Sequence, residues 1–353
     1  MKLIYQQNEY TLEQIPALIH QKKSQPLTDW ERALFRFLAA WFDRKDSVQV
    51  VTSGSTGEPQ SILVRKESML ASARLTNRYF GLQEGDPVWL CLSANYIAGK
   101  MMIVRAVAGN LTLIVTEPLS APVISTPVKF AAMVPMQVET LFKSKSGMET
   151  FSRIPKLIIG GSAVSETLEA RIQSLQTVCY ATYGMTETVS HIAVRQLNGA
   201  QASAVYQALE GVTFEQDERD CLIIHAPHLQ EKPFITNDIV SLVSPVSFEW
   251  KGRYDYVINT GGIKVIPETL ETKLSPFIHK RFFITALPDE ILGQKIVLVI
   301  EGEPFSARQM QDLQSVFSSR LARYEKPRQT IFLPRFVETA SGKVKRIIPA
   351  NEE

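Results

Sequence analysis

Short apolar runs alternate with longer amphipathic stretches through the first 180 residues of the chain. The apolar runs read as buried strands, and stretches in which apolar residues recur every three or four positions read as helices. Strands are expected at residues 48–51, 88–92, 111–115 and 157–159, with another ending at Cys179 and Tyr180. Helices are expected at residues 30–42, 66–80 and 101–108. This alternation predicts βαβ units and a mainly parallel sheet, whose ligands gather at the carboxyl ends of the strands.

The pattern changes near residues 253–255. Beyond them, apolar runs at residues 282–286 and 296–301 alternate with amphipathic helices, and the helix from Ser306 opens with a capping pair, Ser306 and Gln309. A chain of 353 residues is long for one hydrophobic core. We therefore expect an α/β N-terminal domain over residues 1–252 and a compact α+β C-terminal domain over residues 253–353.

Composition and charge describe an ordinary globular protein. Hydrophobic residues make up 45% of the chain and charged residues 21%, and the net charge of +2 gives no ground for a nucleic-acid partner. No apolar run reaches the length of a membrane span, and the first residues lack the apolar core of a signal peptide. The three cysteines are expected to be buried free thiols in a reducing compartment, which predicts a cytoplasmic protein. Cys221, His225 and His228 lack a nearby fourth ligand, so a metal site is not expected there.

Glycine and hydroxyl residues crowd the loop that follows the strand at residues 48–51. Gly54 and Gly57 allow backbone conformations closed to other residues, and hydroxyl groups can donate to phosphate oxygens. The hydroxyl residues are Thr52, Ser53, Ser55 and Thr56. Successive backbone N–H groups in such a turn form a concave anion site. The loop is therefore expected to bind phosphate, the alternative being a mobile Ser/Gly linker.

A second polar turn is expected at residues 183–191, where a strand ends. Tyr183 supplies a flat stacking face, Thr186 a hydroxyl donor for a phosphate oxygen, and Glu187 a hard oxygen ligand for Mg²⁺. The alternative is the start of a helix that a threonine caps.

Substrate contacts are expected at residues 95–99, which lie between a strand and a helix. Arg105 follows on an apolar helix, either with a partly exposed stem or as a buried cation that needs a carboxylate. Taken alone, Asp238 reads as part of a surface turn and Lys343 as part of a solvated basic tail.

In order and spacing, seven motifs resemble those of the adenylate-forming superfamily of acyl-CoA synthetases, luciferases and peptide-synthetase adenylation domains. They lie at residues 52–59, 160–165, 183–188, 237–238, 252–255, 260–262 and 341–343. Within that superfamily, residues 96–105 and the stretches around Asp238 and Gly262 are most similar to the o-succinylbenzoate–CoA ligases of menaquinone synthesis. The resemblance implies a two-domain enzyme with a small mobile C-terminal domain. Most members carry more residues before the phosphate loop, so the large N-terminal domain would be shortened.

The resemblance also implies a role for each residue that would contact ATP. The phosphates would lie on Thr52, Ser53, Gly54, Ser55, Thr56 and Gly57. Adenine would lie beside Tyr183, Gly161, Ser162 and Ala163, and the ribose hydroxyls on Asp238 and Arg253. The catalytic residues would be Thr186 at the α-phosphate, Glu187 as the Mg²⁺ ligand, and Lys343 between the substrate carboxylate and the α-phosphate.

Other residues would serve the acid and coenzyme A. The acid would contact Tyr96, Lys100, Arg105 and Gly184, with Arg105 as the anchor for a second carboxylate. Gly261 and Gly262 would line the tunnel for the pantetheine arm of coenzyme A, and Asp255 would be the hinge of the C-terminal domain.

Two residues depart from the family pattern. Gln60 stands where lysine is usual, so pyrophosphate binding would be weaker or would recruit Arg65 or Lys66. Asn95 and Tyr96 replace the aromatic–histidine pair of many members. The resemblance thus predicts an acid–CoA ligase that uses ATP, Mg²⁺ and coenzyme A. The alternatives are a ligase for another acid and a catalytically weak nucleotide-binding protein.

Overall fold

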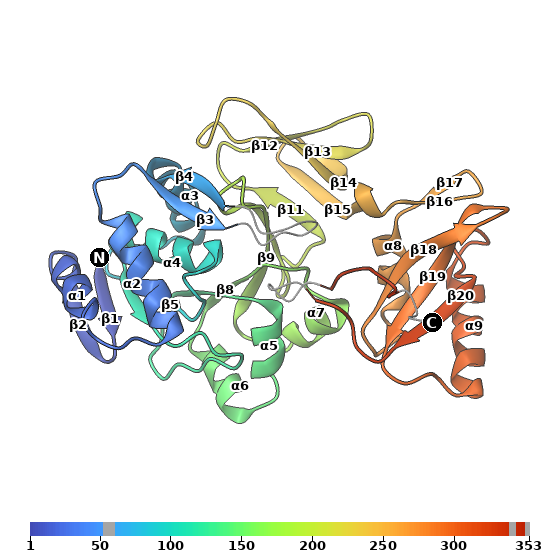
Figure 1. The fold of residues 1–353 in the computed structure, drawn as a ribbon, viewed down its shortest axis with the longest axis horizontal. Coiled ribbons are helices and arrows are strands. Elements are labelled where there is room, and N and C mark those ends of the chain that lie inside the picture. The colour runs from blue at the N-terminus through green and yellow to red at the C-terminus, as the bar shows by residue number, and fades with distance from the viewer. Residues whose placement is uncertain (52–60, 339–343, 350–353) are drawn as a thin grey trace. The chain divides into compact units, whose positions relative to one another are not determined.

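The computed structural model describes residues 1–51, 61–338 and 344–349. The chain forms two compact units (Figure 1). Unit 1 comprises Met1–Thr213 and His225–Pro233, and unit 2 comprises Phe214–Ile224 and Phe234–Glu353. The expected domain boundary between residues 252 and 253 stays a prediction.

A mostly parallel sheet organises unit 1, as the alternation of strands and helices predicts. Its strands are β1 (Lys2–Tyr5), β2 (Asn8–Thr11), β5 (Pro87–Leu90), β6 (Thr112–Val115), β7 (Phe130–Met133), β8 (Lys156–Ile159), β9 (Val178–Gly184), β10 (His191–Gln196) and β11 (Val205–Ala208). They lie in the order β11–β10–β9–β8–β7–β5–β6–β1–β2. All neighbours from β9 to β1 are parallel, whereas β11, β10 and β2 join by antiparallel pairs.

Unit 1 also contains the helices that connect the strands of this sheet. They are α1 (Ile15–Lys22), α2 (Asp29–Trp41), α3 (Lys66–Phe80), α4 (Ile97–Ala108), α5 (Pro135–Leu141), α6 (Lys145–Ser152) and α7 (Glu166–Ile172). Every residue of β7 is buried, as are the last three residues of β8. Strands covered on both faces read as continuous apolar runs, which is why the sequence pattern located them. All three cysteines are buried and free, as predicted, and burial raises the pKa of Cys179 to about 12.

The strand before the predicted phosphate loop is not part of the parallel sheet. β3 (Ser47–Val51) pairs antiparallel with β4 (Ser61–Arg65) as a separate two-stranded sheet, with Val51 opposite Ser61. The expectation that the strand at residues 48–51 belongs to the mainly parallel sheet is therefore wrong, and β4 lies between residues 52–60 and α3 along the chain. The polar residue Gln49 between two valines is the sequence feature that indicates this hairpin. In the structure Val48 and Val50 are buried and Gln49 is exposed, as expected for a strand with one solvated face.

Unit 2 contains a four-stranded run of sheet and a second, separate sheet. The first has the order β12–β13–β14–β15 and leads into the short helix η1. Its elements are β12 (Thr213–Gln216), β13 (Cys221–His225), β14 (Phe234–Ser244), β15 (Ser247–Arg253) and η1 (Tyr254–Tyr256). In the second sheet, β17–β16–β19–β18 is the strand order and β20 pairs parallel with β19. Its strands are β16 (Ile258–Thr260), β17 (Ile263–Val265), β18 (Phe282–Asp289), β19 (Gly293–Glu301) and β20 (Gln329–Leu333).

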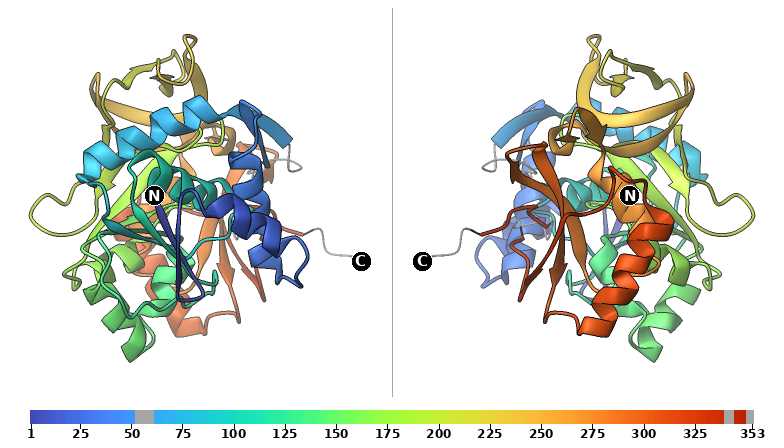
Figure 2. Two further views of the ribbon diagram at one scale, coloured as in Figure 1. Left: turned by 90° about the vertical axis from the view of Figure 1, so that its left-hand side faces the viewer. Right: turned by 90° about the vertical axis from the view of Figure 1, so that its right-hand side faces the viewer.

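Two helices pack against this second sheet, α8 (Pro267–Leu274) and α9 (Ala307–Arg320). Leu313 and Phe317 of α9 join Leu298 and Ile300 of β19 in one core, and Figure 2 shows α9 running alongside the strands. Ser306 caps α9 by accepting from the N–H of Gln309, so the expected capping pair is confirmed.

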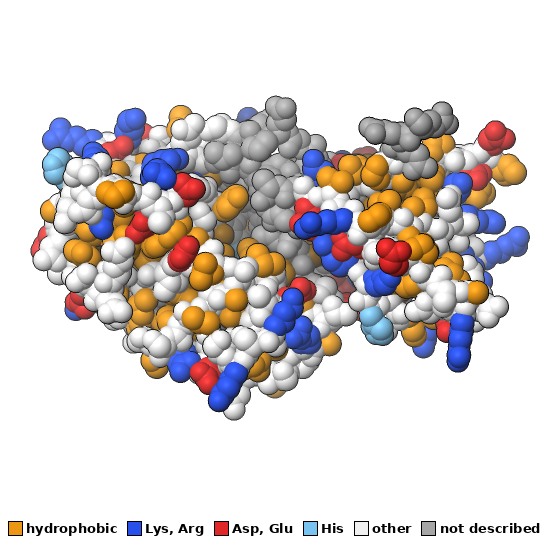
Figure 3. All heavy atoms as spheres, turned by 60° about the horizontal axis from the view of Figure 1, so that its bottom comes forward, with side chains coloured by type: hydrophobic (Ala, Val, Ile, Leu, Met, Phe, Trp, Pro, Cys, Tyr) orange, Lys and Arg blue, Asp and Glu red, His pale blue; other side chains and the backbone are white. Residues whose placement is uncertain are grey.

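Charges of both signs are interspersed on the surface. The face in Figure 3 shows Lys and Arg side chains close to Asp and Glu side chains in both units, in keeping with the net charge of +2. Within the described ranges, each helix is too short or too polar to cross a lipid bilayer.

Candidate functional site

The carboxyl edge of the parallel strands brings several predicted site residues together. β8 and β9 are parallel neighbours, with Ile159 opposite Ala181. The predicted adenine strip, residues 161–163, follows β8, while Tyr183 and Gly184 end β9. Because nucleotides bind at this edge in open α/β sheets, the strand order supports the predicted grouping of these segments.

A buried threonine closes the turn that follows β9. The backbone N–H of Met185 donates to Thr188 Oγ1 at 2.9 Å, and this hydroxyl lies 2.9 Å from the carbonyl O of Ser190. Residues 185–190 contain no helix, so the alternative of a threonine-capped helix start is wrong. The turn holds Val189 at φ +66°, a strained conformation for a β-branched residue, and leaves Glu187 exposed.

Glycine at position 160 lets the ends of β8 and β9 lie close together. A Cβ on Gly160 would lie 2.3 Å from Thr182 Oγ1, and Gly161 has φ +87°. The chain then exposes Ser162 and Ala163 before the side chain of Ser165 caps α7. The strip predicted to border adenine is thus accessible.

Arg105 lies in α4 and is only 2% exposed. Its Nη2 donates to Ser190 Oγ at 2.8 Å and lies 3.5 Å from His191 Nδ1, and its Nε has no hydrogen-bond partner among the described residues. Burial lowers the pKa of Arg105 to about 9, and burial together with the Arg105 charge holds the pKa of His191 well below its usual range. Of the two readings of this residue, the buried cation is correct. Among the described residues, the partners of the Arg105 guanidinium include no carboxylate.

Three other residues predicted to contact the acid lie near the same edge but differ in exposure. Tyr96 is 47% exposed at the start of α4. Lys100 is buried, its Nζ donates to the carbonyl O of Asn95 at 2.8 Å, and burial followed by the charge of Arg36 lowers its pKa to about 8. At Gly184 a Cβ would lie 2.4 Å from the carbonyl O of Ser190, so glycine is required there by the close approach of β10.

In unit 2, the predicted ribose and hinge residues form one polar group. Asp238 of β14 lies opposite Arg253 of β15, with Arg253 Nη1 3.6 Å from Asp238 Oδ1. Arg253 Nη2 also donates to Asp255, whose Oδ1 accepts from Asn237 Nδ2 at 2.9 Å. Burial alone would lower the pKa of Arg253, but the hydrogen bond that it donates to Asp255 and the charge of Asp238 raise it. Asp238 is buried within a strand, so reading it as a surface turn is wrong.

Gly261 and Gly262 form the two-residue turn between β16 and β17. Both have positive φ, +59° and +81°, the combination that a tight hairpin turn of type I′ needs. The remaining predicted site residues, 52–57 and Lys343, lie outside the described residues, as does Gln60.

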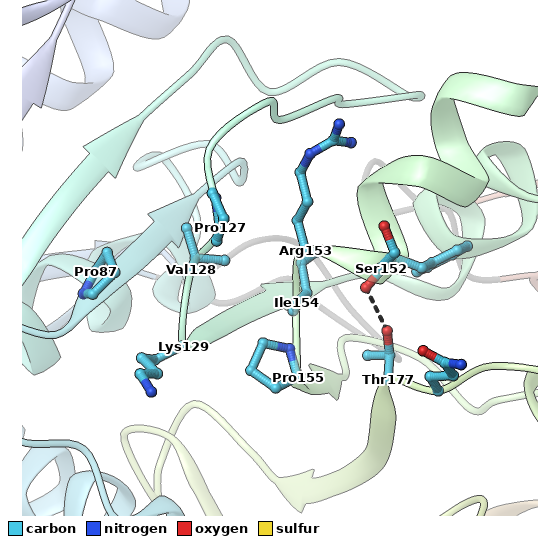
Figure 4. Close-up of a pocket in the computed structure, with 11 residues that line it drawn as sticks. Pro87, Pro127, Val128, Lys129, Ser152, Arg153, Ile154, Pro155 and Thr177 are labelled. Atoms are coloured by element: carbon cyan, nitrogen blue, oxygen red, sulfur yellow. Dashed lines mark hydrogen bonds between the residues drawn. The ribbon is translucent and has the colours of Figure 1, made fainter.

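A cavity of about 480 Å³ lies at the opposite edge of the sheet (Figure 4). Pro87 begins β5, and Lys129, Pro155 and Thr177 immediately precede β7, β8 and β9. This is the amino edge of the strands, and none of the predicted site residues lines it. It does not correspond to the nucleotide site that the strand order favours.

Sequence reasoning missed the polar residues that surround Arg105. Ser190 and His191 contact its guanidinium, Thr76 Oγ1 lies 3.3 Å from His191 Nε2, and Asn77 Nδ2 donates to the Arg105 carbonyl O at 2.9 Å. Their only signal is polarity at buried helix and strand positions, which cannot be recognised before the neighbours of α4 are known.

Comparison with known proteins identifies the family. The AMP-binding enzyme family matches residues 13–213. The 2-succinylbenzoate–CoA ligase of Listeria monocytogenes is 25% identical over 338 residues, which cover 88% of this chain and 70% of that protein. The enzyme of the same name from Escherichia coli is 22% identical, with 87% and 69% covered.

Comparison with solved structures supports the same family. An acyl-CoA synthetase (AMP-forming)/AMP-acid ligase II-like protein from Dyadobacter fermentans is 34% identical, with a TM-score of 0.64 over 94% of this chain and 96% of that one. The o-succinylbenzoate coenzyme A synthetase of Bacillus subtilis, solved with ATP and magnesium, shares the fold at 18% identity, with a TM-score of 0.67 over 84% and 68% of the two chains. The chain therefore belongs to the AMP-binding enzyme family and has the fold of the adenylate-forming acid–CoA ligases.

Proposed function

We propose that this protein is an AMP-forming acid–CoA ligase whose acid is 2-succinylbenzoate, as in menaquinone biosynthesis. The observation that carries the choice of acid is Arg105, a buried guanidinium for which the described residues supply no carboxylate. Family membership and the names of the most similar relatives support the reaction class.

The reaction would proceed in two steps. The acid carboxylate attacks the α-phosphorus of ATP, the bond to the β-phosphate breaks, and acyl-adenylate and pyrophosphate form. The thiol of coenzyme A then attacks the acyl carbon, loses its proton, and displaces AMP. Catalysis of the first step depends mainly on positioning and on neutralising phosphate charge.

Residues on the carboxyl edge of unit 1 fit the ATP side of this reaction. Tyr183 and the exposed Gly161–Ala163 strip would border adenine, and Thr186 would donate to the α-phosphate. Among the described residues, no cluster of three or more His, Cys, Asp or Glu could hold a metal ion. Mg²⁺ usually keeps several waters and takes one or two carboxylates plus substrate phosphates. The exposed Glu187 would be that carboxylate, and the ion would offset phosphate charge.

Asp238 and Arg253 would bind the ribose hydroxyls, since a carboxylate accepts hydrogen bonds from hydroxyl groups. Residues 52–57 would cradle the β- and γ-phosphates, and Lys343 would bridge the carboxylate and the α-phosphate. Asp255, which accepts from both Arg253 and Asn237, would be the hinge that brings Gly261 and Gly262 to the pantetheine arm.

Arg105 suits an acid with two carboxylates. A buried cation without an anion is unfavourable, and a ligand carboxylate would relieve that cost through charge-assisted hydrogen bonds. The orphan Nε is one free donor, and Ser190 and His191 restrain the rest of the guanidinium. In 2-succinylbenzoate one carboxylate is activated, and the other is free to reach this group.

The direct test is pyrophosphate release with ATP, Mg²⁺ and 2-succinylbenzoate, followed by detection of the thioester by mass after coenzyme A is added. Release with other acids only would retain the ligase and reject 2-succinylbenzoate. Folded protein that binds ATP but releases no pyrophosphate with any acid would be a nucleotide-binding protein. Gln60→Lys would then be the first variant to make.

Arg105→Met sharpens the test of the acid. We expect the KM for 2-succinylbenzoate to rise by on the order of a hundred-fold with the KM for ATP unchanged, because a buried charge contact to the acid is lost. The unliganded variant should be no less stable than wild type, since an unpaired buried cation has been removed. Arg78→Met, which removes an exposed arginine of α3 paired with Glu210, is the matched control. A KM for the acid that stays within about two-fold of wild type in Arg105→Met would reject the anchor.

The cysteines and the co-substrates also bear on where in the cell the protein acts. Three free, buried cysteines fit a reducing environment, and ATP and coenzyme A are cytoplasmic substrates, so we also propose a cytoplasmic location.

A further inference from the structure

A guanidinium near the end of the chain is held between two carboxylates of unit 2. Arg346 Nη2 donates to Glu271 Oε2 at 2.8 Å, and Nη1 donates to Glu271 Oε1 and, at 3.0 Å, to the carbonyl O of Ile284. Glu268 Oε1 lies 3.4 Å from Nη2. The guanidinium also lies 5.1 Å from the centre of the Tyr256 ring. Groups from α8, β18 and η1 thus converge on one side chain.

This cluster, Arg346 with Glu268 and Glu271, is largely shielded from solvent. The side chains are 16%, 9% and 20% exposed, respectively. A Cβ on Gly252 would lie 2.5 Å from Glu268 Oε2, so β15 packs directly on that carboxyl. A bidentate arginine–carboxylate pair fixes geometry as well as adding energy, so the cluster specifies where residue 346 lies on unit 2.

The chain on both sides of residues 339–343 is also anchored. Glu338 and Val344 form an antiparallel bridge, and the N–H of Lys345 donates to the carbonyl O of Val337 at 2.8 Å. Glu338 Oε1 accepts from Arg281 Nη2 at 2.6 Å. These contacts tie the chain before residue 339 to the chain after residue 343.

From residue 344 onward, exposure alternates as it does along a strand. Val344, Arg346 and Ile348 are partly buried, whereas Lys345 and Ile347 are exposed. Val344 and Ile348 pack against an apolar cluster of β18, β19 and Phe336. A shift by one residue would exchange the two faces, so the side chain of Arg346 fixes the register of this segment.

We propose that Arg346 is a positioning residue for the adenylation step, because it fixes the register of residues 344–348 and through them the reach of Lys343. This inference rests on the proposed function. Lys343 precedes Arg346 by three residues, and three residues of extended chain span at most about 10 Å, so a slip at Arg346 is passed on to Lys343. A misplacement of about 1 Å at a reacting group can reduce a rate about a hundred-fold.

The two half-reactions separate this role from a general structural one. In Arg346→Gln we expect kcat for ATP–pyrophosphate exchange to fall by about a hundred-fold with the KM for ATP little changed. Thioester formation from supplied acyl-adenylate should be largely kept, because Lys343 serves only the first step. Lys345→Gln, which removes the neighbouring exposed cation, is the matched control and should behave as wild type.

Variants of the two carboxylates that contact Arg346 should reduce adenylation to different extents. Glu271→Gln removes the bidentate partner and should reproduce most of the Arg346→Gln loss. Glu268→Gln leaves the Glu271 pair intact and should have a small effect on adenylation. An equal effect of Glu268→Gln and Glu271→Gln would contradict the assignment of the bidentate pair as the anchor.

Hydrogen exchange provides a readout that needs no activity. Arg346→Gln should speed amide exchange at residues 344–348 without changing exchange in the β18–β19 core. Unchanged protection of residues 344–348, or an equal loss of both half-reactions in folded protein, would overturn the inference. If the wild-type protein activates no acid, the proposed function fails, and the exchange comparison decides whether Arg346 fixes this segment.

Discussion

A buried carboxyl next to a guanidinium that another carboxylate already binds should make stability depend on pH. Burial first, and then the charge of Glu271, raises the pKa of Glu268 to about 7 against the opposing charge of Arg346. Between the ordinary value of 4.5 and about 7, the folded protein keeps a proton that the unfolded chain loses. The free energy of unfolding should therefore fall as pH rises through this window, by about 3 kcal/mol for this group.

Glu268→Gln is the variant that measures this effect, because the amide is neutral at every pH and similar in shape. Urea unfolding at about pH 4.5 and pH 8 should show wild type losing stability relative to the variant as pH rises. Lys345→Gln, which changes an exposed charge on the adjoining segment, should track wild type. A difference between wild type and Glu268→Gln that does not change with pH would contradict the raised pKa.

At the scale of residues, the sequence limited the possible environments of Arg105 but did not identify its neighbours. Because Arg105 lies on an apolar helix, the sequence left two alternatives, a partly exposed stem or a buried cation. The structure shows that the side chain is buried. The sequence did not predict the contacts of Ser190 and His191 with Arg105, because these residues lie 85 and 86 positions away from it along the chain. Such contacts depend on which helix covers which strand end, and no local pattern encodes that.

At the scale of elements, Gly160 tests how closely β8 and β9 must approach. In Gly160→Ala the new Cβ would meet Thr182 Oγ1 at 2.3 Å, so the Thr182 side chain must rotate or one of the two strand ends must shift. We expect a loss of about 1–3 kcal/mol in the free energy of unfolding, typical of overpacking. If residues 161–163 border adenine, the KM for ATP should rise as well.

Removing the obstructing atom supplies the control for this experiment. Thr182→Ala deletes Oγ1, which otherwise donates to the carbonyl O of Ile159 at 3.3 Å. The double variant should recover most of the stability that Gly160→Ala loses, which a double-mutant cycle measures as a coupling energy. Additive losses would show that the contact is not what requires glycine.

The sequence predicted the buried parallel strands well, because strands covered on both faces leave continuous apolar runs. It failed at β3 and β4, where the alternation is short and residues 52–60 separate the two strands along the chain. Reading the run at residues 48–51 as apolar throughout gave it a place in the main sheet, although exposed Gln49 interrupts the run.

At the scale of the whole molecule, the two half-reactions should depend on different parts of the chain. If Lys343 has the role proposed for it, Lys343→Ala should reduce adenylation by on the order of a hundred-fold or more, because a cation that would offset phosphate charge is lost. The same variant should keep much of the thioester step when acyl-adenylate is supplied. Rates of pyrophosphate exchange and of thioester formation, measured separately, give the comparison, and equal losses would reject the role of Lys343.

The order of the motifs along the chain predicted the family before any strand was placed, and the family match over residues 13–213 confirms it. Domain organisation is a separate question. The change of pattern near residue 253 predicts a domain boundary, which stays a prediction, and the compact units divide within residues 213–234. Compactness reflects packing between distant strands, and composition along the chain does not record it.

The hairpin of β3 and β4 has a consequence for how this enzyme could diversify. Five cross-strand pairs, from Ser47 with Arg65 to Val51 with Ser61, hold the two ends of the glycine-rich segment side by side. Chain inserted between such ends tolerates changes in length and composition, because the closure entropy grows slowly with loop length. A change in the number of residues between Val51 and Ser61 should therefore cost little stability, because the paired strands keep the flanking residues in place, whereas the identities of residues 52–57 stay constrained by the phosphate-binding role proposed for them.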